Sequence, residues 1–283
     1  MKNIIISTDS TSDLPCDLIE KYDIRVLPLH IVNDTESFKD GIEITADELI
    51  AQQKAGKLFK SAAANVAEWE EFYDSFGEND GVVNFTISGE MSSTFTNSRI
   101  AAEGRKEIYT VDSQNLSTGI GLLILCACDF REQGFSAKEI YEKIEEIKPY
   151  VRASFVIDTL DFLYKGGRCS AIAALGANLL KLKPCIEVKD GKMDVAKKYR
   201  GNINDVIKKY IADKLANYDN IDNDKVFITH TMDKEHLAIV DEMIDYVKTN
   251  YGFKHVYTST AGCTISVHCG ANTLGILYID KKQ

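Results

Sequence analysis

The fold is decided by the stretch Gly81-Val82-Val83-Asn84-Phe85, followed directly by Thr86-Ile87-Ser88-Gly89-Glu90-Met91-Ser92-Ser93-Thr94-Phe95. The first five residues are apolar enough to predict a buried strand. The hydroxyl-rich stretch leads into a predicted helix over residues 94–102. Strand-like runs also occur at residues 4–7 and 108–111, with helical patterns between them. Strands that alternate with helices predict a parallel sheet covered on both faces.

Helix starts are predicted where a capping residue precedes Glu by three positions, at residues 45–48, 65–68 and 136–139. Residues 116–133 form a further predicted helix that is apolar all round in its middle and ends at Gly134. Residues 25–32 are predicted to be one strand of the sheet.

Ligands of a parallel sheet bind at the carboxyl ends of its strands. The loops expected there are residues 8–14, 86–94 and 112–118, and all three are rich in Ser, Thr and Asp. The sequence therefore predicts a binding site built from hydroxyl and carboxylate groups.

The second half of the chain has a different pattern. Residues 186–195 form two alternating runs joined by Asp190-Gly191, which predicts a β-hairpin. Further strands are expected at residues 151–157, 226–231, 255–259 and 274–279, with helices at residues 203–216 and 234–250. We therefore expect two domains. Residues 1–155 are predicted to form a three-layer α/β/α domain, and residues 156–283 an α+β domain with a mixed sheet.

The composition is that of a soluble globular protein, with 45% hydrophobic and 27% charged residues. A net charge of −10 argues against nucleic acid and anionic membrane surfaces as partners. The longest apolar run, residues 119–128, is about half of the roughly 20 residues that span a bilayer. With no signal-peptide pattern at the N-terminus, we expect a cytoplasmic protein without stable membrane insertion. The seven cysteines form no C-x-x-C pair and are interpreted as small buried hydrophobes.

Several common catalytic motifs are absent from the sequence. It contains no Walker phosphate loop, no G-x-G-x-x-G, no H-E-x-x-H and no G-x-S-x-G. The five histidines lack metal-ligand spacing, and we expect neither a metal nor a cofactor. These absences lower the odds of nucleotide, zinc and hydrolase chemistry.

The Ser92-Ser93-Thr94 cluster precedes a predicted helix, where hydroxyls, free backbone N–H groups and the helix dipole make an anion site. The alternative is that Ser92 or Ser93 only caps the helix. Ser61 could direct a second hydroxyl at the same anion, or be a solvated loop residue.

Other polar residues carry weaker signals. Asp9 and Asp13 could bind a metal, although turn and cap roles are favoured. Lys165-Gly166-Gly167-Arg168 is expected to be a loop between a strand and a helix that presents a cation, or merely a solvated loop. His268 lies just before the predicted final strand, where it is either a functional histidine or an ordinary structural one.

These segments together resemble the DegV family, in order along nearly the whole chain. The resemblance rests on Thr8-Asp9-Ser10-Thr11-Ser12-Asp13-Leu14, Ile87-Ser88-Gly89-Glu90-Met91-Ser92-Ser93-Thr94, Val111-Asp112-Ser113 with Ser117-Thr118-Gly119-Ile120-Gly121, Lys165-Gly166-Gly167-Arg168, Lys181-Leu182-Lys183-Pro184 and His268-Cys269-Gly270.

The resemblance implies a DegV-like fold that binds a long-chain fatty acid, such as palmitate, in an inter-domain tunnel. It places the carboxylate on hydroxyls of Ser61 and Ser92. It also implies a non-catalytic carrier that presents the acyl chain to the separate ATP-binding subunit of a fatty acid kinase. The full set of implied lipid-site residues is Ser61, Ser88, Ser92, Ser93, Thr94 and His268, and the implied kinase-facing residues are Arg168, Arg200 and His268.

The sequence departs from the family pattern at two places. Lys60-Ser61-Ala62-Ala63-Ala64-Asn65 stands where the family has Lys-Thr-Ser-Gln-Pro-Ser, and Gly270-Ala271-Asn272-Thr273 replaces Gly-Pro-Gly-Thr. A hydroxyl is kept at Ser61, so carboxylate binding is expected to survive.

Burying about fifteen methylenes at about 0.8 kcal/mol each gives roughly 12 kcal/mol of gross transfer energy. The tunnel walls are expected from the helix over residues 116–133 and from an apolar set that could equally be plain core: Phe155, Ile157, Leu160, Leu163 and Ile172. The alternatives to a carrier are a hydrolase or phosphotransferase using Ser92, His268 and Asp9, or a regulatory interaction module.

Overall fold

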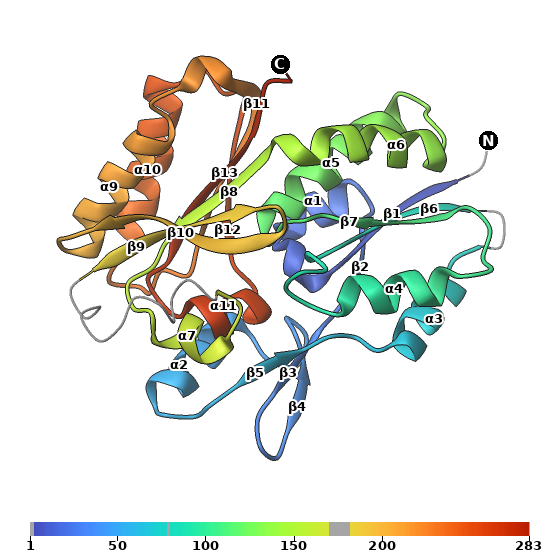
Figure 1. The fold of residues 1–283 in the computed structure, drawn as a ribbon, viewed down its shortest axis with the longest axis horizontal. Helices are drawn as coiled ribbons and strands as arrows, with labels where there is room; N and C mark the ends of the chain where they lie inside the picture. Colours follow the sequence, from blue (N-terminus) through green and yellow to red (C-terminus); the bar gives the residue numbers. More distant parts are fainter. Residues whose placement is uncertain (1–2, 78–79, 170–181, 283) are drawn as a thin grey trace.

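The computed structural model describes residues 3–77, 80–169 and 182–282, which form three sheets with helices packed around them (Figure 1). The predicted α/β class is confirmed, with a parallel sheet and a separate mixed sheet. Short 3₁₀ turns are η1 (Ser10–Ser12), η2 (Lys148–Tyr150) and η4 (Tyr218–Asn220).

The parallel sheet has the strand order β2-β1-β6-β7. Its strands are β1 (Ile4–Asp9), β2 (Arg25–Leu27), β6 (Gly81–Thr86) and β7 (Ile108–Asp112). Every residue of β6 is buried, because helices cover both faces of the sheet (Figure 1). One layer contains α5 (Thr118–Glu132) and α6 (Ala137–Ile147), the other contains α3 (Val66–Asp74) and α4 (Thr94–Ala102), and α1 (Cys16–Lys21) connects β1 to β2.

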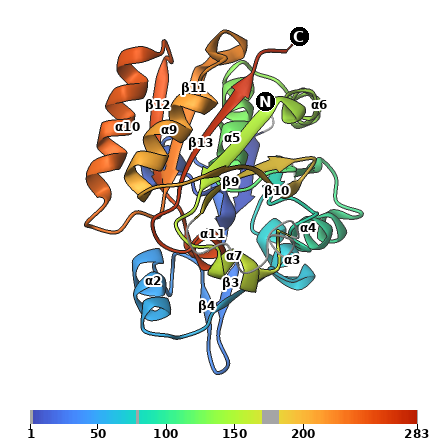
Figure 2. The ribbon, with the colours of Figure 1, turned by 60° about the vertical axis from the view of Figure 1, so that its left-hand side comes forward.

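The mixed sheet has the strand order β10-β9-β8-β13-β11-β12, with β11 and β12 parallel and the other pairs antiparallel. Its strands are β8 (Val151–Val156), β9 (Lys183–Lys189), β10 (Lys192–Tyr199), β11 (Ile221–His230), β12 (His255–Thr260) and β13 (Leu274–Asp280). One face packs on α9 (Ile203–Lys214) and α10 (Leu237–Asn250) (Figure 2). Because β8 belongs to this sheet, the chain enters it at Val151; the domain boundary near residue 155 stays a prediction.

Helix α5 lies between the two large sheets, in contact with β1 and β6 on one side and with β8, β11 and β13 on the other. This position explains why its sequence is apolar all round. Leu122, Leu123 and Ile124 are each 0% exposed although they point in different directions around the helix. At its two ends, Thr118 Oγ1 bonds Thr229 Oγ1 of β11 at 2.5 Å, and Asp129 pairs with Lys225 Nζ at 2.7 Å.

A third, antiparallel sheet of order β4-β3-β5 was not expected from the sequence. Residues 25–32, predicted as one strand, are split at Pro28-Leu29: the first part is β2 of the parallel sheet and the second is β3. Proline lacks the N–H that a continuous ladder needs. The small sheet consists of β3 (His30–Val32), β4 (Ser37–Lys39) and β5 (Lys60–Ala62), and three helices pack near it: α2 (Ala46–Lys54), α7 (Asp161–Gly166) and α11 (Cys263–Cys269).

Local sequence signals place several elements well. The three predicted capping boxes are confirmed at Thr45, Asn65 and Ser136. The predicted loop at Lys165-Gly166 was wrong, because both residues belong to the last turn of α7. His268 does precede the final strand, but it lies in α11, a helix that the sequence reading missed. Both helices are too short to show a clear apolar period.

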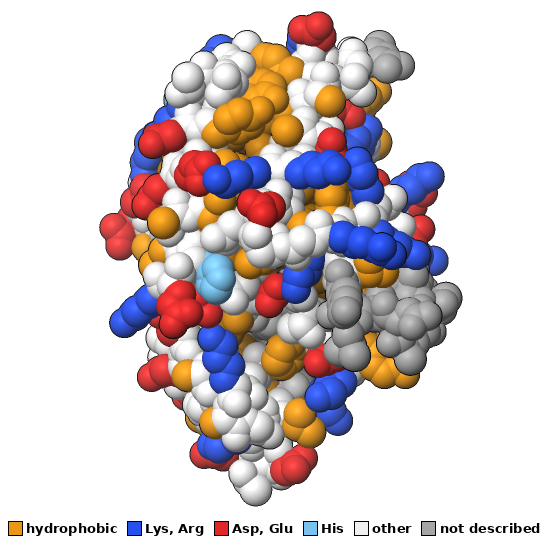
Figure 3. Space-filling model, turned by 90° about the vertical axis from the view of Figure 1, so that its left-hand side faces the viewer, with side chains coloured by type: hydrophobic (Ala, Val, Ile, Leu, Met, Phe, Trp, Pro, Cys, Tyr) orange, Lys and Arg blue, Asp and Glu red, His pale blue; other side chains and the backbone are white. Residues whose placement is uncertain are grey.

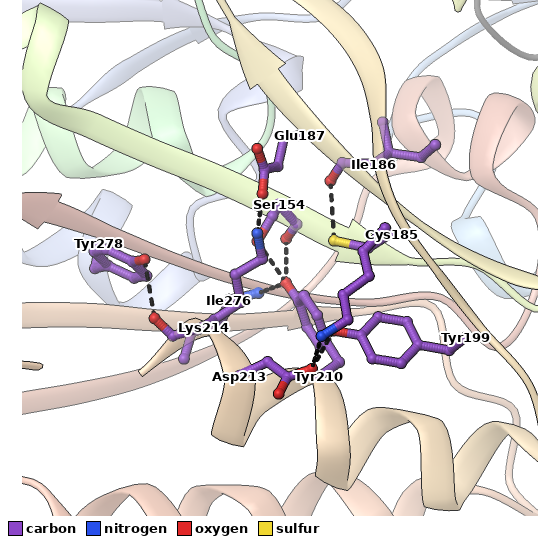
Figure 4. Close-up of polar contacts among 11 residues, drawn as sticks. Ser154, Cys185, Ile186, Glu187, Tyr199, Tyr210, Asp213, Lys214, Ile276 and Tyr278 are labelled. Carbon is purple, nitrogen blue, oxygen red and sulfur yellow. Dashed lines mark hydrogen bonds and ion pairs between the residues drawn. The ribbon is translucent and has the colours of Figure 1, made fainter. Parts of the chain in front are cut away.

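The core of the mixed sheet contains a fully buried phenol (Figure 4). The Tyr210 hydroxyl on α9 donates to the Ser154 carbonyl at 2.7 Å and accepts from the Ile276 N–H at 3.0 Å. It therefore joins α9 to β8 and β13 without leaving a buried polar group unpaired. Burial raises the pKa of this phenol well above its usual value, so it stays a neutral donor.

The surface has mixed charge. The face in Figure 3 has Lys and Arg side chains in a band across its middle, with Asp and Glu side chains among them. Exposed pairs such as Lys208–Glu242 at 2.7 Å contribute at most about 1 kcal/mol each. Within the described ranges, none of the helices has both the length and the apolar character that a membrane crossing requires.

The β9–β10 hairpin touches the parallel sheet through its turn. Asp190 and Gly191 both have positive φ, as the predicted Asp-Gly turn requires, and the Ser88 hydroxyl donates to the Gly191 carbonyl at 2.7 Å. A Cβ on Gly191 would lie 2.6 Å from Ser88 Oγ. We therefore expect Gly191→Ala to lower the free energy of unfolding by about 2–3 kcal/mol, through backbone strain and loss of this bond.

The matched control is Gly104→Ala, because Gly104 has a similar φ of +80° and open space around its Cβ position. This control should lower the free energy of unfolding, measured by urea denaturation, by only about 1 kcal/mol, which is the cost of placing alanine at a positive φ. Equal losses in the two variants would show that the hairpin contact contributes no stability.

Candidate functional site

A cavity of about 200 Å³ lies where the polar loops of the parallel sheet face α11 and the small sheet. Hydroxyl, imidazole and guanidinium groups line it together with many apolar side chains. Its lining is Leu29, Ser61, Ala62, Ala63, Ile87, Met91, Ser92, Ser93, Leu116, Leu163, Arg168, Met193, Thr264, Ile265, His268 and Cys269.

One hydrogen bond joins two of the predicted site residues. Ser61 in β5 and His268 in the last turn of α11 are 207 positions apart, yet Ser61 Oγ lies 2.8 Å from His268 Nε2. Nδ1 of His268 is buried and has no hydrogen-bond partner among the described residues. A Cβ on Gly166 would lie 2.2 Å from this atom, so only glycine fits there. Burial, helped by the charge of Arg168, lowers the pKa of His268 to about 4, and the imidazole is neutral.

Ser92 and Ser93 also line the cavity, at the N-terminus of α4. Ser92 Oγ bonds Thr94 Oγ1 at 2.8 Å and accepts from the Thr94 N–H at 3.2 Å. Ser93 occupies the N-cap position, but its side chain makes no capping bond. The helix start therefore has hydroxyls and backbone N–H groups at the cavity, the arrangement expected of an anion site.

Three predicted site residues are not in the cavity lining. The Ser88 hydroxyl is buried and points to the hairpin turn, and Thr94 is buried behind Ser92. Arg200 follows β10 at the end opposite the hairpin turn and is exposed. Arg168 does line the cavity, and its guanidinium donates to the Gly166 carbonyl at 2.6 Å.

Three buried aspartates stand behind the cavity and fix the elements that form it. Asp9 accepts from the Ile87 N–H at 2.9 Å, at the start of the Ser92 loop. Asp13 accepts from the Gly262 N–H at 2.8 Å, and Asp40 accepts from the N–H groups of Cys263 and Thr264.

The same carboxylates also accept from hydroxyl groups. Thr11 Oγ1 donates to Asp9, Ser117 Oγ to Asp13 at 2.5 Å, and Ser10 Oγ to Asp40 at 3.0 Å. The turn and cap interpretation of Asp9 and Asp13 is therefore the one their contacts support. Within the described part of the chain, no group of His, Cys, Asp and Glu residues could hold a metal ion.

Burial dominates the titration of this cluster. It raises the pKa of Asp13 to about 8 and that of Asp9 to about 6, against the opposing effect of the hydrogen bonds that each accepts. The negative charge of Asp40 raises both pKa values further. Asp13 is therefore largely protonated at neutral pH.

A second, apolar cavity of about 30 Å³ adjoins the first and shares Leu116, Ile265 and Cys269 with it. Of the residues predicted as tunnel walls, Leu163 lines the first cavity and Phe155 the second. Ile157 and Leu160 are buried without lining either, and Ile172 and Lys181 lie outside the described residues.

Sequence reasoning missed Asp40, Leu29 and Thr264. Asp40 and Leu29 gave no local signal, because their roles depend on the small sheet that was not foreseen. Thr264 lies four positions before His268, which is one helical turn. Recognising α11 as a helix would have placed the two side chains on one face.

The chain is similar to known proteins along nearly its whole length. A model of the DegV family, described as a family of uncharacterised proteins, matches residues 3–281. The chain belongs to the DegV family. It is 32% identical to a DegV domain-containing protein of Caldanaerobacter subterraneus subsp. tengcongensis, over 99% of this chain and 100% of that protein. The resemblance inferred from ordered motifs is confirmed.

Solved DegV structures share the fold. A DegV family protein from Thermus thermophilus, described by its fatty acid binding, matches with a TM-score of 0.89 and 26% identity, over 99% of this chain and 100% of that one. A stearic acid-binding protein from Eubacterium ventriosum matches with a TM-score of 0.83 and 26% identity, over 99% of each chain.

The raised aspartate pKa values have a consequence for stability. Asp9 and Asp13 hold protons more tightly in the folded than in the unfolded protein, so their protonation stabilises the fold. This contribution to the free energy of unfolding is fully present below about pH 4. It is lost as pH rises through about 6 for Asp9 and about 8 for Asp13. We therefore expect the stability of Asp13→Asn, measured relative to that of the parent at the same pH, to increase as pH rises from about 5 to about 8.5.

Thermal midpoints of the parent and the variant across this range measure the effect. Asp34→Asn, at an exposed loop position, is the control variant. A pH-independent difference for Asp13→Asn would contradict the raised pKa.

Proposed function

We propose that this protein binds a long-chain fatty acid, with the carboxylate at Ser61 and Ser92 and the acyl chain extending along the apolar side of the cavity. The observation that supports this most is the Ser61–His268 bond at the polar end of a cavity whose remaining lining is largely apolar. The fatty acid binding described for DegV proteins of similar fold supports the same ligand class.

The two ends of the ligand have separate roles in this proposal. The acyl chain supplies most of the binding energy through burial, since each methylene contributes about 0.8 kcal/mol. The hydroxyls of Ser61 and Ser92 offset the cost of desolvating the carboxylate and fix which way the ligand lies. Arg168 places a positive charge at the same end, and His268 can donate from Nε2 as a neutral imidazole.

The proposal includes presentation of the carboxylate to a separate ATP-binding kinase subunit. Arg168 and His268 lie at the carboxylate end, where a phosphoryl group would be transferred. Arg200 is exposed and makes no ion pair with any described residue, which leaves it available to a partner. The second cavity, adjoining the first, is the proposed continuation of the acyl tunnel.

Three observations weigh against a hydrolase that uses Ser92 and His268. The Ser92 hydroxyl bonds Thr94, whereas the imidazole bonds Ser61. In a serine triad, a carboxylate orients the histidine through Nδ1; here Nδ1 faces Gly166. With a pKa near 4, the imidazole is also a weak general base at neutral pH. A carrier without catalysis of its own fits these features better.

Removing either hydroxyl should weaken the complex. We expect Ser61→Ala and Ser92→Ala each to raise the Kd for palmitate by an amount equivalent to about 1–3 kcal/mol, through the lost charge-assisted hydrogen bond. Isothermal titration on delipidated protein measures the Kd. Ser37→Ala, at an exposed position in β4, is the control. An unchanged Kd in both variants would show that these serines do not hold the carboxylate.

The ligand class is tested separately, by mass analysis of lipid extracted from the purified protein.

A residue that only faces a kinase partner should affect acyl phosphate formation without affecting palmitate binding. Arg200→Ala, outside the cavity lining, should leave palmitate binding intact but reduce acyl phosphate formation with a fatty acid kinase subunit and ATP by about tenfold or more. Arg99→Ala, on an exposed part of α4 and paired with Glu103, is the control. Parallel loss of binding and phosphorylation would argue against a docking role.

A further inference from the structure

Thr264 presents an unpaired hydroxyl in the interior of the protein. The residue is 4% exposed and belongs to the lining of the cavity that Ser61, Ser92 and His268 share. Its backbone N–H donates to Asp40, yet Oγ1 has no hydrogen-bond partner in the described ranges. Such a group requires an explanation, because buried hydroxyls in proteins are nearly always bonded.

The other buried hydroxyls around the two cavities do have partners. Each of the following bonds is internal to the protein: Ser61 to His268, Ser88 to Gly191, Ser117 to Asp13, Ser154 to Tyr210, Thr229 to Thr118, Thr231 to Gly270 and Thr273 to Cys269. Among the described residues of the lining, the buried polar atoms without a partner are therefore Thr264 Oγ1 and His268 Nδ1, and Thr264 Oγ1 is the hydroxyl of the two. A valine of the same shape would avoid the cost of about 1–3 kcal/mol that an unpaired buried hydroxyl carries.

Thr264 lies near the carboxylate end of the proposed ligand. It precedes His268 by four residues in α11, so the two side chains share one face of the helix and lie about 6 Å apart along its axis. The Ser61–His268 bond marks the position of the carboxylate. A hydroxyl one helical turn away faces the first few carbons of the acyl chain. Threonine has two populated χ1 states in a helix, so rotation about χ1 can bring Oγ1 to face the cavity that the side chain lines.

We propose that Thr264 hydrogen-bonds an oxygen substituent near the carboxyl end of the acyl chain, and that the site favours 3-hydroxy fatty acids over unsubstituted ones. This inference rests on the proposed fatty acid binding. A ligand hydroxyl that loses water in an apolar cavity needs a protein partner, and Thr264 Oγ1 both donates and accepts. With an unsubstituted chain, the Thr264 hydroxyl stays unpaired.

The test compares palmitate with 3-hydroxypalmitate by isothermal titration on delipidated full-length protein. The parent should bind 3-hydroxypalmitate more tightly. Thr264→Val should weaken 3-hydroxypalmitate binding by about tenfold and leave palmitate binding unchanged or tighter. Thr264→Ser keeps the hydroxyl and should keep the preference. Thr258→Val, at an exposed position in β12, is the matched control, and thermal midpoints check that each variant is folded.

The outcomes separate this inference from the function on which it rests. If Thr264→Val weakens both acids equally, Thr264 contacts the carboxylate and the selectivity for hydroxy acids is wrong. If the parent binds both acids alike, and Thr264→Val leaves that ratio unchanged, the inference is also overturned. If the delipidated parent binds neither acid, the proposed function itself fails.

Discussion

Everything at the cavity depends on how the first turn of α11 is held by Asp13 and Asp40. Their carboxyl groups accept from the N–H groups of Gly262, Cys263 and Thr264, while Asp9 fixes the loop that contains Ser92. Grouping three carboxyl groups in the interior is costly, which the raised pKa values of Asp9 and Asp13 express. In return, backbone from three distant parts of the chain meets at one point.

That arrangement determines what chemistry the site can support. The aspartates are occupied by backbone and hydroxyl donors, so they position groups and do not face a ligand. The groups left facing the cavity are mostly neutral: serine hydroxyls, one uncharged imidazole and one threonine, with Arg168 at the edge. A site of this kind suits a molecule with a single acidic end and a long apolar body, because burial can dominate its binding.

Sequence reasoning recovered the features that are local or strongly periodic. The capping boxes, the Asp190-Gly191 turn and the alternation of strands with helices each follow from a few neighbouring residues. It failed at the small sheet, because the break at Pro28-Leu29 was not recognised, and at α11, which is too short to show a clear apolar period. It failed at Asp40 because the partners of this residue lie more than 200 positions away in the sequence. Ser61, Ser92 and His268 were named through family resemblance, but the bond between Ser61 and His268 required the folded chain.

The apolar helix α5 limits how the molecule can move. Its side chains belong at once to the cores on both of its sides, and its ends are tied to β11 by Thr118 and Asp129. Swinging the two large sheets apart like a hinge would expose Leu122, Leu123 and Ile124 to water, at a cost of several kcal/mol. A change that opens the cavity therefore has to proceed by small shifts of the elements around it, while both large sheets stay packed on α5.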